Sequence, residues 1–344
     1  MHPIGIVIEP DGVLHDTGAA HPETAERLRV LLRLIGTERI QQLQPRLIDC
    51  GQATEQDLLR VHTPTHVQRI KATANLHVRL DADTLASPRS WDVARAAAGG
   101  AIAAVRAVVS GEVRSAMALV RPPGHHAEPD RAMGFCLFNN VAIAARHARD
   151  ILGIQRVAII DFDAHHGNGT QAIFWHDPSV LYVSTHQQDL FPHTGAAQEL
   201  GEGAGRGRTI NIPLRAGHGD AEYDAIYGAL IPRILERFRP NLILVSAGYD
   251  IATGDPLAGM TVTPEGFIRI AAHLVNVANV VCAGRVVFVL EGGYSAGGLT
   301  EGVAATLQAM AGVVVVDDPP GPLRRLPLGD ALEYLDIYDE FFPL

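Results

Sequence analysis

Short apolar segments recur along the chain at wide intervals, and most of them lack the alternation of polar and apolar residues seen in half-exposed strands. Continuous runs of aliphatic and β-branched residues are typical of strands that are buried on both faces of a parallel sheet. The pattern predicts about eight strands, of which the last named is the weakest: Ile4–Ile8, Ala116–Val120, Val157–Ile160, Val180–Ser184, Thr209–Ile212, Leu242–Val245, Val286–Leu290 and Leu47–Asp49.

Segments with a helical spacing of apolar residues lie between these strands. Pro22–Ile35 gathers its leucines on one face and begins with a proline, which suits the first turn of a helix. Thr54 and Asp57 form an acidic variant of the capping box at the start of Glu55–His62. Further helices are predicted over Trp91–Val109, Asn140–Leu152, Asp220–Phe238, Pro264–Val281 and Ser295–Met310.

Strands that alternate with helices predict a mostly parallel sheet with helices on both faces, which is a three-layer α/β architecture. The chain shows no repeat, low-complexity tract or Pro/Ser-rich linker that would separate two folding units. We therefore expect a single domain that spans residues 1–344 and is built on an eight-stranded sheet.

The composition agrees with a folded protein that has a large core. Apolar residues make up 47% of the 344 residues, and 28 basic against 38 acidic residues give a formal net charge of −10. A chain with this acidic balance is not expected to bind a polyanion by bulk charge, which argues against nucleic acid as a direct partner. The histidine content is unusual, with 16 residues, so the positions of the histidines carry information about function.

The sequence gives no sign of a membrane span or a secretion signal. No uninterrupted apolar run reaches the roughly 18 residues needed to cross a bilayer, and the segment Met1–Gly5 lacks the basic start of a signal peptide. Cys50, Cys136 and Cys282 are far apart and form no CxxC motif. A disulfide framework is therefore not expected, and a reducing, cytoplasmic location fits.

Polar residues follow four of the predicted strands at the points where the strands end. In open α/β sheets, ligands bind at the carboxyl ends of the strands, so these residues are expected to meet at one edge of the sheet. The four segments are Arg121–His126, Asp161–Gly169, Ser246–Asp250 and Glu291–Tyr294.

The second of these segments has the spacing of a metal-binding motif. Side chains two positions apart in an extended chain point the same way, so Asp161, Asp163 and His165 share one face. Carboxylates and imidazoles are ligands of zinc, and a catalytic zinc keeps three protein ligands and one open position. Asp163, His165 and Asp250 could supply the three, while Asp161 is better suited to orienting a neighbouring group.

The adjacent histidines His125 and His126 suggest general acid–base chemistry. Near a metal site, one imidazole could take a proton from water and later protonate a leaving group. A carboxylate raises the basicity of a histidine and fixes its tautomer, so Asp161 would suit one of the pair and the neutral Asn168 the other. Tyr294, after a double glycine, could project into the cleft and donate to a developing oxyanion. A polar loop that caps helices without a metal is the alternative.

In these motifs the chain resembles the zinc-dependent histone deacetylase and acetylpolyamine amidohydrolase family. The resemblance extends over nearly the whole chain. Asn168 and the Glu-Gly-Gly-Tyr form of the last motif are similar to the class II-like branch of the family and its bacterial relatives. The matching segments are His21–Glu23, Arg121–Ala127, Gly134–Cys136, Asp161–Gly169, Ser246–Asp250, Gly254–Pro256 and Glu291–Tyr294.

The resemblance implies an arginase-like α/β fold and a hydrolase that removes an acetyl or other acyl group from an N-acylated amine. It implies one Zn²⁺ held by Asp163, His165 and Asp250, with Tyr294 polarising the substrate carbonyl. The products would be a carboxylate, such as acetate, and a free amine.

The resemblance also implies roles for the residues around the metal. His126 is the implied general base and acid, with Asn168 as its partner, and His125, paired with Asp161, is an electrostatic helper. Arg27 matches the arginine beside the internal product channel of the family, although a solvated helix face is the alternative. The implied walls of an acyl-lysine tunnel are Gly134, Phe135, Phe191 and Leu257.

A monovalent cation, usually potassium, is implied close to the zinc. Its implied ligands are Asp161, the backbone carbonyls of Asp163 and His165, and Ser184 and Thr185. A second such site is implied near Phe174, Asp177 and Val180.

Two functions of other kinds are less favoured by the residues. Ureohydrolases of the same fold bind two manganese ions through further carboxylates, and this chain has Gly167 and Ala252 at the corresponding positions. A dinuclear site is therefore not expected. A catalytically silent binding or regulatory homologue is expected to have lost a metal ligand, the tandem histidines or the tyrosine, and none of these is lost.

The sequence leaves the natural amine open. Polyamine-selective members of the family are expected to place an acidic residue near the cleft mouth, and this chain has Leu257 after Gly254–Pro256, so acyl-lysine is favoured over acetylpolyamine. Asp81 and Asp83 could hold a cationic or peptide ligand at the rim, although acids of a solvated loop are the alternative. The expected partner is an acylated lysine or a small acylated amine, and assembly into a homo-oligomer is left open.

Overall fold

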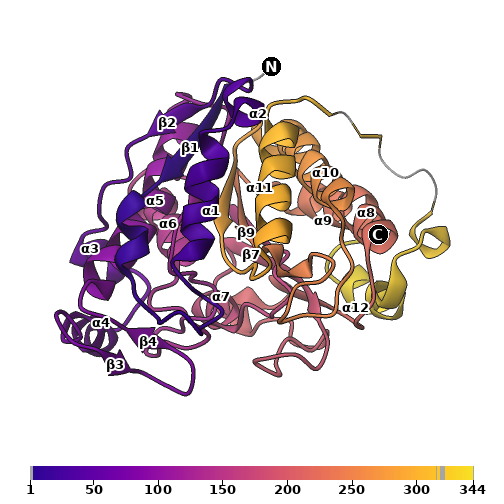
Figure 1. The fold of residues 1–344 in the computed structure, drawn as a ribbon. Coiled ribbons are helices and arrows are strands. Elements are labelled where there is room, and N and C mark those ends of the chain that lie inside the picture. Colours follow the sequence, from indigo (N-terminus) through magenta and orange to yellow (C-terminus); the bar gives the residue numbers. More distant parts are fainter. Residues whose placement is uncertain (1–2, 315, 318–321, 344) are drawn as a thin grey trace.

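An eight-stranded parallel sheet forms the centre of the structure (Figure 1). The computed structural model describes residues 3–314, 316–317 and 322–343. The strands are hydrogen-bonded in the order β2-β1-β5-β10-β9-β6-β7-β8, and every pairing among them is parallel. The predicted strands are confirmed, with ends that differ by a few residues. Their bounds are β1 Ile4–Ile8, β2 Arg46–Ile48, β5 Ser115–Leu119, β6 Val157–Asp161, β7 Val180–Gln187, β8 Thr209–Leu214, β9 Leu242–Ala247 and β10 Val286–Leu290.

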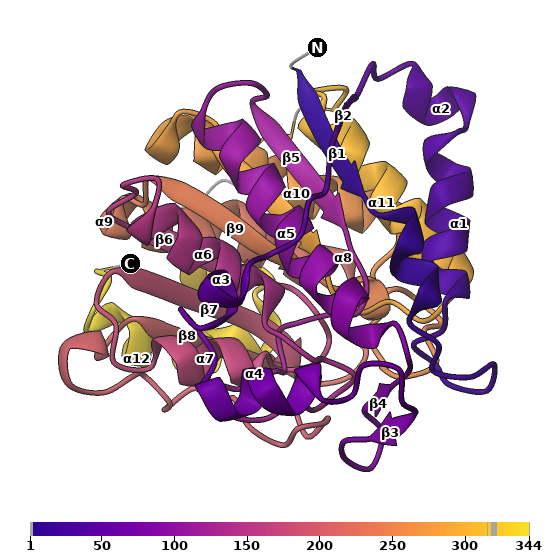
Figure 2. The ribbon, with the colours of Figure 1, turned by 90° about the vertical axis from the view of Figure 1, so that its left-hand side faces the viewer.

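Helices cover both faces of this sheet. Figures 1 and 2 show α5 and α6 over one face and α10 and α11 over the other, where α1, α8 and α9 also pack. Successive residues of a strand face the two cores, so that Val287 packs against α5 and α6 while Phe288 packs with α10 and α11. The helices are α1 Glu26–Ile35, α2 Glu38–Gln41, α3 Glu55–Leu58, α4 Pro64–Lys71, α5 Ser90–Val109, α6 Asn140–Asp150, α7 Asn168–Phe174, α8 Asp220–Ala225, α9 Ile231–Phe238, α10 Pro264–Cys282, α11 Ala296–Met310 and α12 Leu335–Asp339.

The topology brings the four polar strand ends together. β5, β10, β9 and β6 are neighbours in the middle of the sheet, although they are far apart in the sequence. Because these strands are parallel, their carboxyl ends lie at the same edge. The register places Asp161 beside Ser246 of β9, and Ser246 beside Val289 of β10. The segments that follow the four strands therefore meet at the carboxyl edge of the sheet, near its middle strands.

The helix predicted over Asp220–Phe238 is interrupted in the structure. A π-helical turn over Ile226–Leu230 separates α8 from α9. The wider turn carries Tyr227, whose hydroxyl lies 2.8 Å from Thr185 Oγ1 at the end of β7. Because all residues of this turn are buried, they give no amphipathic pattern from which a change of helix type could be predicted. The turn is accompanied by the contact between Tyr227 and Thr185, which are distant in sequence.

Among the described residues, four short α-helices and both strands of a hairpin are absent from the sequence prediction: α2, α4, α7, α12, β3 Val78–Arg79 and β4 Leu85–Ala86. α4 is short and carries a charged outer face, α7 begins at Asn168 inside a motif segment, and β3 pairs with β4 in a short antiparallel hairpin. The hairpin matters for function, because the turn between its strands holds Asp81 and Asp83 close to the site.

α10 is the one helix among the described residues whose length and composition would allow it to cross a membrane. In the structure 67% of its apolar window is buried, and the helix packs against α8, α9 and α11. These contacts are those of a core helix in the layer that covers the sheet.

Candidate active site

Two aspartates and a histidine converge at the carboxyl edge of the sheet. Asp163 and His165 follow β6, and Asp250 lies in the 3₁₀ turn Tyr249–Ile251 after β9. One donor atom from each of the three side chains lies within 4.8 Å of the other two, and all three residues are buried. His165 Nδ1 is 2.9 Å from Asp250 Oδ2 and 3.1 Å from Asp163 Oδ1. The structure therefore brings together the three side chains that the sequence analysis proposes as metal ligands.

Backbone amides hold the two carboxylates in this arrangement. Gly292 N donates to Asp163 Oδ2 and Ala164 N donates to Asp250 Oδ1, each at 2.8 Å. A side chain at Gly292 would place its Cβ 2.4 Å from Asp250 Oδ2. The double glycine after β10 thus allows the backbone to approach the carboxylates closely.

The charge of this cluster is suited to a cation. Burial and the neighbouring carboxylate of Asp163 raise the pKa of Asp250 to about 7. Burial opposes the protonation of His165, but the two carboxylates outweigh it and raise the pKa of His165 to about 10. Two carboxylates that face each other in the interior need a positive charge between them. Two carboxylate oxygens and one imidazole nitrogen are also a donor set of catalytic zinc, so the residues present fit Zn²⁺.

The structure has no room for the carboxylate that a second metal would need at position 167. A Cβ at Gly167 would lie 2.4 Å from Asp161 Oδ2 and 2.5 Å from the Tyr182 hydroxyl. Ala252, at the other corresponding position, carries no donor atom. This packing supports a mononuclear site.

The two adjacent histidines have different partners. His125 Nδ1 is 3.1 Å from Asp161 Oδ2, which also accepts a hydrogen bond from the Tyr182 hydroxyl. His126 Nδ1 is 2.8 Å from Asn168 Oδ1. Burial lowers the pKa of His125, but Asp163 and Asp161 more than reverse this and raise it to about 10. Burial and the two nearby histidines, His125 and His165, instead lower the pKa of His126 well below its usual value.

The contacts of Asn168 define the tautomer of His126. Asn168 Nδ2 donates to Glu128 Oε1 at 2.7 Å, so its Oδ1 faces the imidazole. An amide oxygen can only accept a hydrogen bond. We therefore assign the proton of neutral His126 to Nδ1, which leaves the lone pair on Nε2.

The backbone of the histidine pair is fixed by Glu291. Glu291 Oε2 accepts hydrogen bonds from Gly124 N at 2.6 Å and from His125 N at 3.0 Å. Glu291 Oε1 accepts from Ser246 Oγ at 3.2 Å. One carboxylate, which follows β10, therefore joins the segment after β5 to the end of β9.

Tyr294 is held at the backbone on both sides. Gly293 has a φ of +116°, and its carbonyl accepts from Arg27 Nε at 2.7 Å. Tyr294 N donates to Asp255 Oδ2, also at 2.7 Å. The ring packs against Phe135 with a centroid separation of 5.8 Å. The tyrosine therefore stands at a defined place in the wall of the site.

Arg27 is buried, which excludes the alternative of a solvated helix face. Its guanidinium carbon lies 5.0 Å from the centroid of the Tyr294 ring. Both residues line a cavity of about 110 Å³ on the α1 side of the tyrosine.

A narrow cavity of about 240 Å³ leads to the metal-ligand cluster. Gly134 has a φ of +55°, and a Cβ there would lie 2.5 Å from the His126 ring and 2.9 Å from Phe191. Glycine is thus required where the wall approaches the histidine. The predicted tunnel residues all line this cavity, whose full set is Asp83, His126, Gly134, Phe135, His165, Leu190, Phe191, Leu257 and Tyr294.

The two acids of the rim loop have different places. Asp83 lines the cavity, whereas Asp81 Oδ1 accepts from the backbone amides of Asp83 and Thr84 and so belongs to the turn itself. Thr84 Oγ1 accepts from Phe135 N at 3.1 Å, and His21 Nε2 lies 2.9 Å from the Asp83 carbonyl. The rim loop therefore supports the wall of the cavity.

The residues expected to hold potassium lie around the ends of β6 and β7. Asp161 is paired with Ser184 in the sheet register, and Thr185 Oγ1 donates to the Asp161 carbonyl at 3.4 Å. The assignment of Asp161, Ser184 and Thr185 as potassium ligands remains a proposal. At the second expected site, the carboxylate of Asp177 forms ion pairs with Arg146 and Arg149. A cation there would have to rely on backbone carbonyls.

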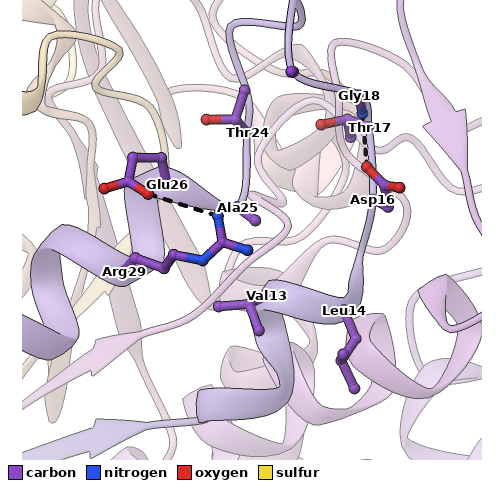
Figure 3. A pocket seen from close by; sticks show the side chains of 10 residues that line it. Val13, Leu14, Asp16, Thr17, Gly18, Thr24, Ala25, Glu26 and Arg29 are labelled. Carbon is purple, nitrogen blue, oxygen red and sulfur yellow. Dashed lines mark hydrogen bonds and ion pairs between the residues drawn. The ribbon is translucent and has the colours of Figure 1, made fainter.

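A larger hollow of about 510 Å³ lies beside the start of α1, away from this site (Figure 3). Its charged groups pair with nearby groups, since Arg29 lies 3.6 Å from Glu26 and Asp16 Oδ1 accepts from Gly18 N. None of the predicted site residues lines it.

The sequence analysis assigned no role to three carboxylates that shape the site. Glu128 orients Asn168, Asp255 holds the backbone of Tyr294, and Glu291 holds the backbone of His125. Glu291 and Asp255 fall inside motif segments, and Glu128 follows His126 by two positions. Their proximity to recognised motifs is the one signal in the sequence that could have pointed to them.

Comparisons with known proteins agree with this geometry. The histone deacetylase domain family matches residues 21–310. Over 323 residues the chain is 42% identical to a histone deacetylase-like amidohydrolase of Pseudomonas aeruginosa, which covers 92% of this chain and 83% of that protein. It is 39% identical over 337 residues to the human polyamine deacetylase HDAC10, covering 93% of this chain and 49% of that protein.

A solved structure has the same fold over the full length. The crystal structure of the HDA15 HD domain matches with a TM-score of 0.90 and 35% sequence identity, and the match covers 100% of this chain and 97% of that one. This likeness confirms the predicted deacetylase-like α/β fold.

Proposed function

Because the chain belongs to the histone deacetylase family and is an amide deacetylase, we propose that it acts on acylated lysine by way of a single zinc site. The proposal rests on one observation. Asp163, His165 and Asp250 converge within 4.8 Å, and His126 and Tyr294 stand beside His165 in the wall of the same narrow cavity.

The residues divide the chemistry among them. Asp163, His165 and Asp250 would hold Zn²⁺, which would supply a Lewis acid for the amide carbonyl and for water. His126 Nε2 carries the lone pair that takes a proton from the attacking water, and the same nitrogen then returns a proton to the leaving amine. The Tyr294 hydroxyl donates to the carbonyl oxygen as negative charge develops on it. His125, held by Asp161 at 3.1 Å, adds positive charge nearby.

The walls of the cavity favour a lysine side chain over a polyamine. Phe135, Phe191 and Leu257 line it and suit the apolar methylene stem of lysine, whose backbone would remain at the mouth. A polyamine carries a second ammonium group in place of that backbone. Leu257 offers this charge no partner, and Asp83 is the single acid among the lining residues. The alternative of a small acetylated amine is supported by Asp83 and by the likeness to the human polyamine deacetylase.

A substrate panel tests the choice of amine. We expect kcat/KM for an acetyl-lysine peptide to exceed that for N-acetylputrescine by about tenfold, since a polar group left without a partner costs roughly 1–3 kcal/mol. Leu257→Glu supplies an acid at the mouth and is expected to shift the ratio toward N-acetylputrescine by a similar factor. Leu257→Gln is the matched control without charge. A native preference for N-acetylputrescine would reverse the assignment of substrate.

Metal analysis tests the site itself. Elemental analysis of the purified chain is expected to give one zinc per chain, and Asp250→Asn is expected to bind far less because it removes one charged ligand. Gln42→Ala, at an exposed side chain that pairs with Glu38 beside α2, is the control for general effects of substitution. Two manganese ions per chain together with hydrolysis of a guanidino substrate would instead indicate a ureohydrolase.

A further inference from the structure

Glu128 lies just behind the proposed catalytic base and touches it only through Asn168. Its Oε1 accepts from Asn168 Nδ2 at 2.7 Å, and Asn168 Oδ1 is 2.8 Å from His126 Nδ1. We propose that Glu128 is a positioning residue that sets the tautomer of His126 by fixing which end of the Asn168 amide faces the imidazole. The proposal rests on the proposed function, in which His126 Nε2 is the base.

A primary amide can be placed in two ways that differ little in shape. Its oxygen accepts hydrogen bonds and its nitrogen donates them. With the oxygen toward His126, Nδ1 carries the proton and Nε2 is basic. If the amide were turned over, its nitrogen would donate to Nδ1, and the proton would move to Nε2. The second tautomer cannot take a proton from water at Nε2, so the orientation of Asn168 decides whether His126 can act as a base.

Without Glu128, the surroundings of Asn168 would do little to favour one orientation over the other. Besides His126 and Glu128, its side chain contacts the Met133 sulfur at 3.4 Å, which is a weak acceptor. A carboxylate accepts hydrogen bonds and cannot donate them, so Glu128 requires the nitrogen of the amide to face it. Charge-assisted hydrogen bonds of this kind are also stronger than neutral ones.

Glu128 is itself held in place. Arg131 donates to Glu128 Oε2 at 2.9 Å. The backbone amide of Glu128 donates to the Arg131 carbonyl at 2.9 Å, and the Glu128 carbonyl lies 2.9 Å from His62 Nδ1. Asn168 is buried, with 7% of its surface exposed. Asn168 and His126 are thus shielded from solvent, whereas the side chain of Glu128 is 23% exposed and is held by the contacts above.

A change of charge at both ends of the relay tests this inference. Glu128→Lys replaces an acceptor by a donor, turns the Asn168 amide over, and is expected to lower kcat by about 10²-fold, because it removes the general base. Asn168→Asp alone places two carboxylates against each other and is expected to lower kcat by about tenfold. The two substitutions together pair an ammonium with a carboxylate that needs no orientation. The double variant is expected to return to within about tenfold of the native kcat.

Direct observation of the imidazole separates positioning from general damage. Nitrogen NMR of histidine-labelled protein distinguishes protonated from unprotonated ring nitrogens and requires no turnover. We expect the proton of His126 on Nδ1 in the native chain and in the double variant, and on Nε2 in Glu128→Lys. Arg206→Gln removes the same charge at an exposed arginine whose partner is Glu340, and it is expected to keep the native kcat and tautomer.

Two other results would overturn the inference. One is an unchanged His126 tautomer in Glu128→Lys; the other is a double variant with lower kcat than either single variant. Glu128→Leu covers the case in which the lysine variant does not fold. It removes the acceptor, so the Asn168 amide can take either orientation, and we expect a mixture of the two His126 tautomers. A single native tautomer in this variant would also overturn the inference. A native chain that hydrolyses no amide but shows the expected tautomers would contradict the proposed function. The role of Glu128 in setting the His126 tautomer would still be supported.

Discussion

His126→Ala is expected to lower kcat by about 10³-fold, within the range that a general acid–base catalyst contributes. The imidazole lines the cavity, and its Nδ1 is engaged by Asn168 at 2.8 Å, so Nε2 is the nitrogen available to water. No other described residue in the cavity lining offers a neutral base in this position, because His165 belongs to the metal-ligand cluster. Steady-state kinetics with an acetyl-lysine peptide measure the loss.

His125→Ala is the matched comparison for this prediction. His125 lies 4.0 Å from His126 between ring centroids, but it does not line the cavity and is held by Asp161. We expect its loss to lower kcat by about tenfold, which corresponds to roughly 1.4 kcal/mol of transition-state stabilisation. Zinc content is measured for both variants. If His125→Ala loses more kcat than His126→Ala while both retain zinc, the two roles must be exchanged.

The central sheet and the metal ligands are the parts of this protein that the sequence predicts best. Both follow from strictly local geometry. A run such as Val286–Leu290 can be buried on both faces only as an inner strand, and the spacing from Asp163 to His165 places both side chains on one side of an extended segment. The convergence of Asp250 with them follows from the rule that ligands gather at the carboxyl ends of parallel strands.

The remaining features depend on contacts that no local pattern contains. Nothing in the local sequence distinguishes Asp81 from Asp83. In the structure Asp81 accepts hydrogen bonds within the β3–β4 turn, whereas Asp83 lines the cavity. The π-helical turn at Ile226–Leu230 accompanies a contact between Tyr227 and Thr185. From the sequence alone Glu128 resembles any surface acid, whereas in the structure its Oε1 lies 2.7 Å from Asn168 Nδ2. Residues that support a site through long-range contacts are thus hidden from the sequence, whereas those in spaced motifs are visible.

Tyr294→Phe is expected to lower kcat by about 10²- to 10³-fold, the usual loss for one donor to a developing oxyanion, or roughly 2.7–4 kcal/mol. Phenylalanine retains the ring and therefore both of its contacts. The Phe135 ring lies 5.8 Å away between centroids, and the guanidinium carbon of Arg27 lies 5.0 Å from the ring centroid. The backbone amide of residue 294 would still donate to Asp255. The substitution therefore removes the hydroxyl and little else, and kcat is expected to fall with KM nearly unchanged.

The distribution of the loss between kcat and KM decides what the hydroxyl does. A donor that acts only as negative charge develops on the carbonyl oxygen lowers kcat and kcat/KM equally when it is removed. A hydroxyl that merely holds the substrate would raise KM and spare kcat, because the ground state and the transition state would lose the same contact. Zinc content should match the native chain in either case, since Tyr294 is not one of the three clustered ligands. A native kcat in the zinc-loaded variant would remove Tyr294 from the mechanism and leave polarisation of the carbonyl to the metal alone.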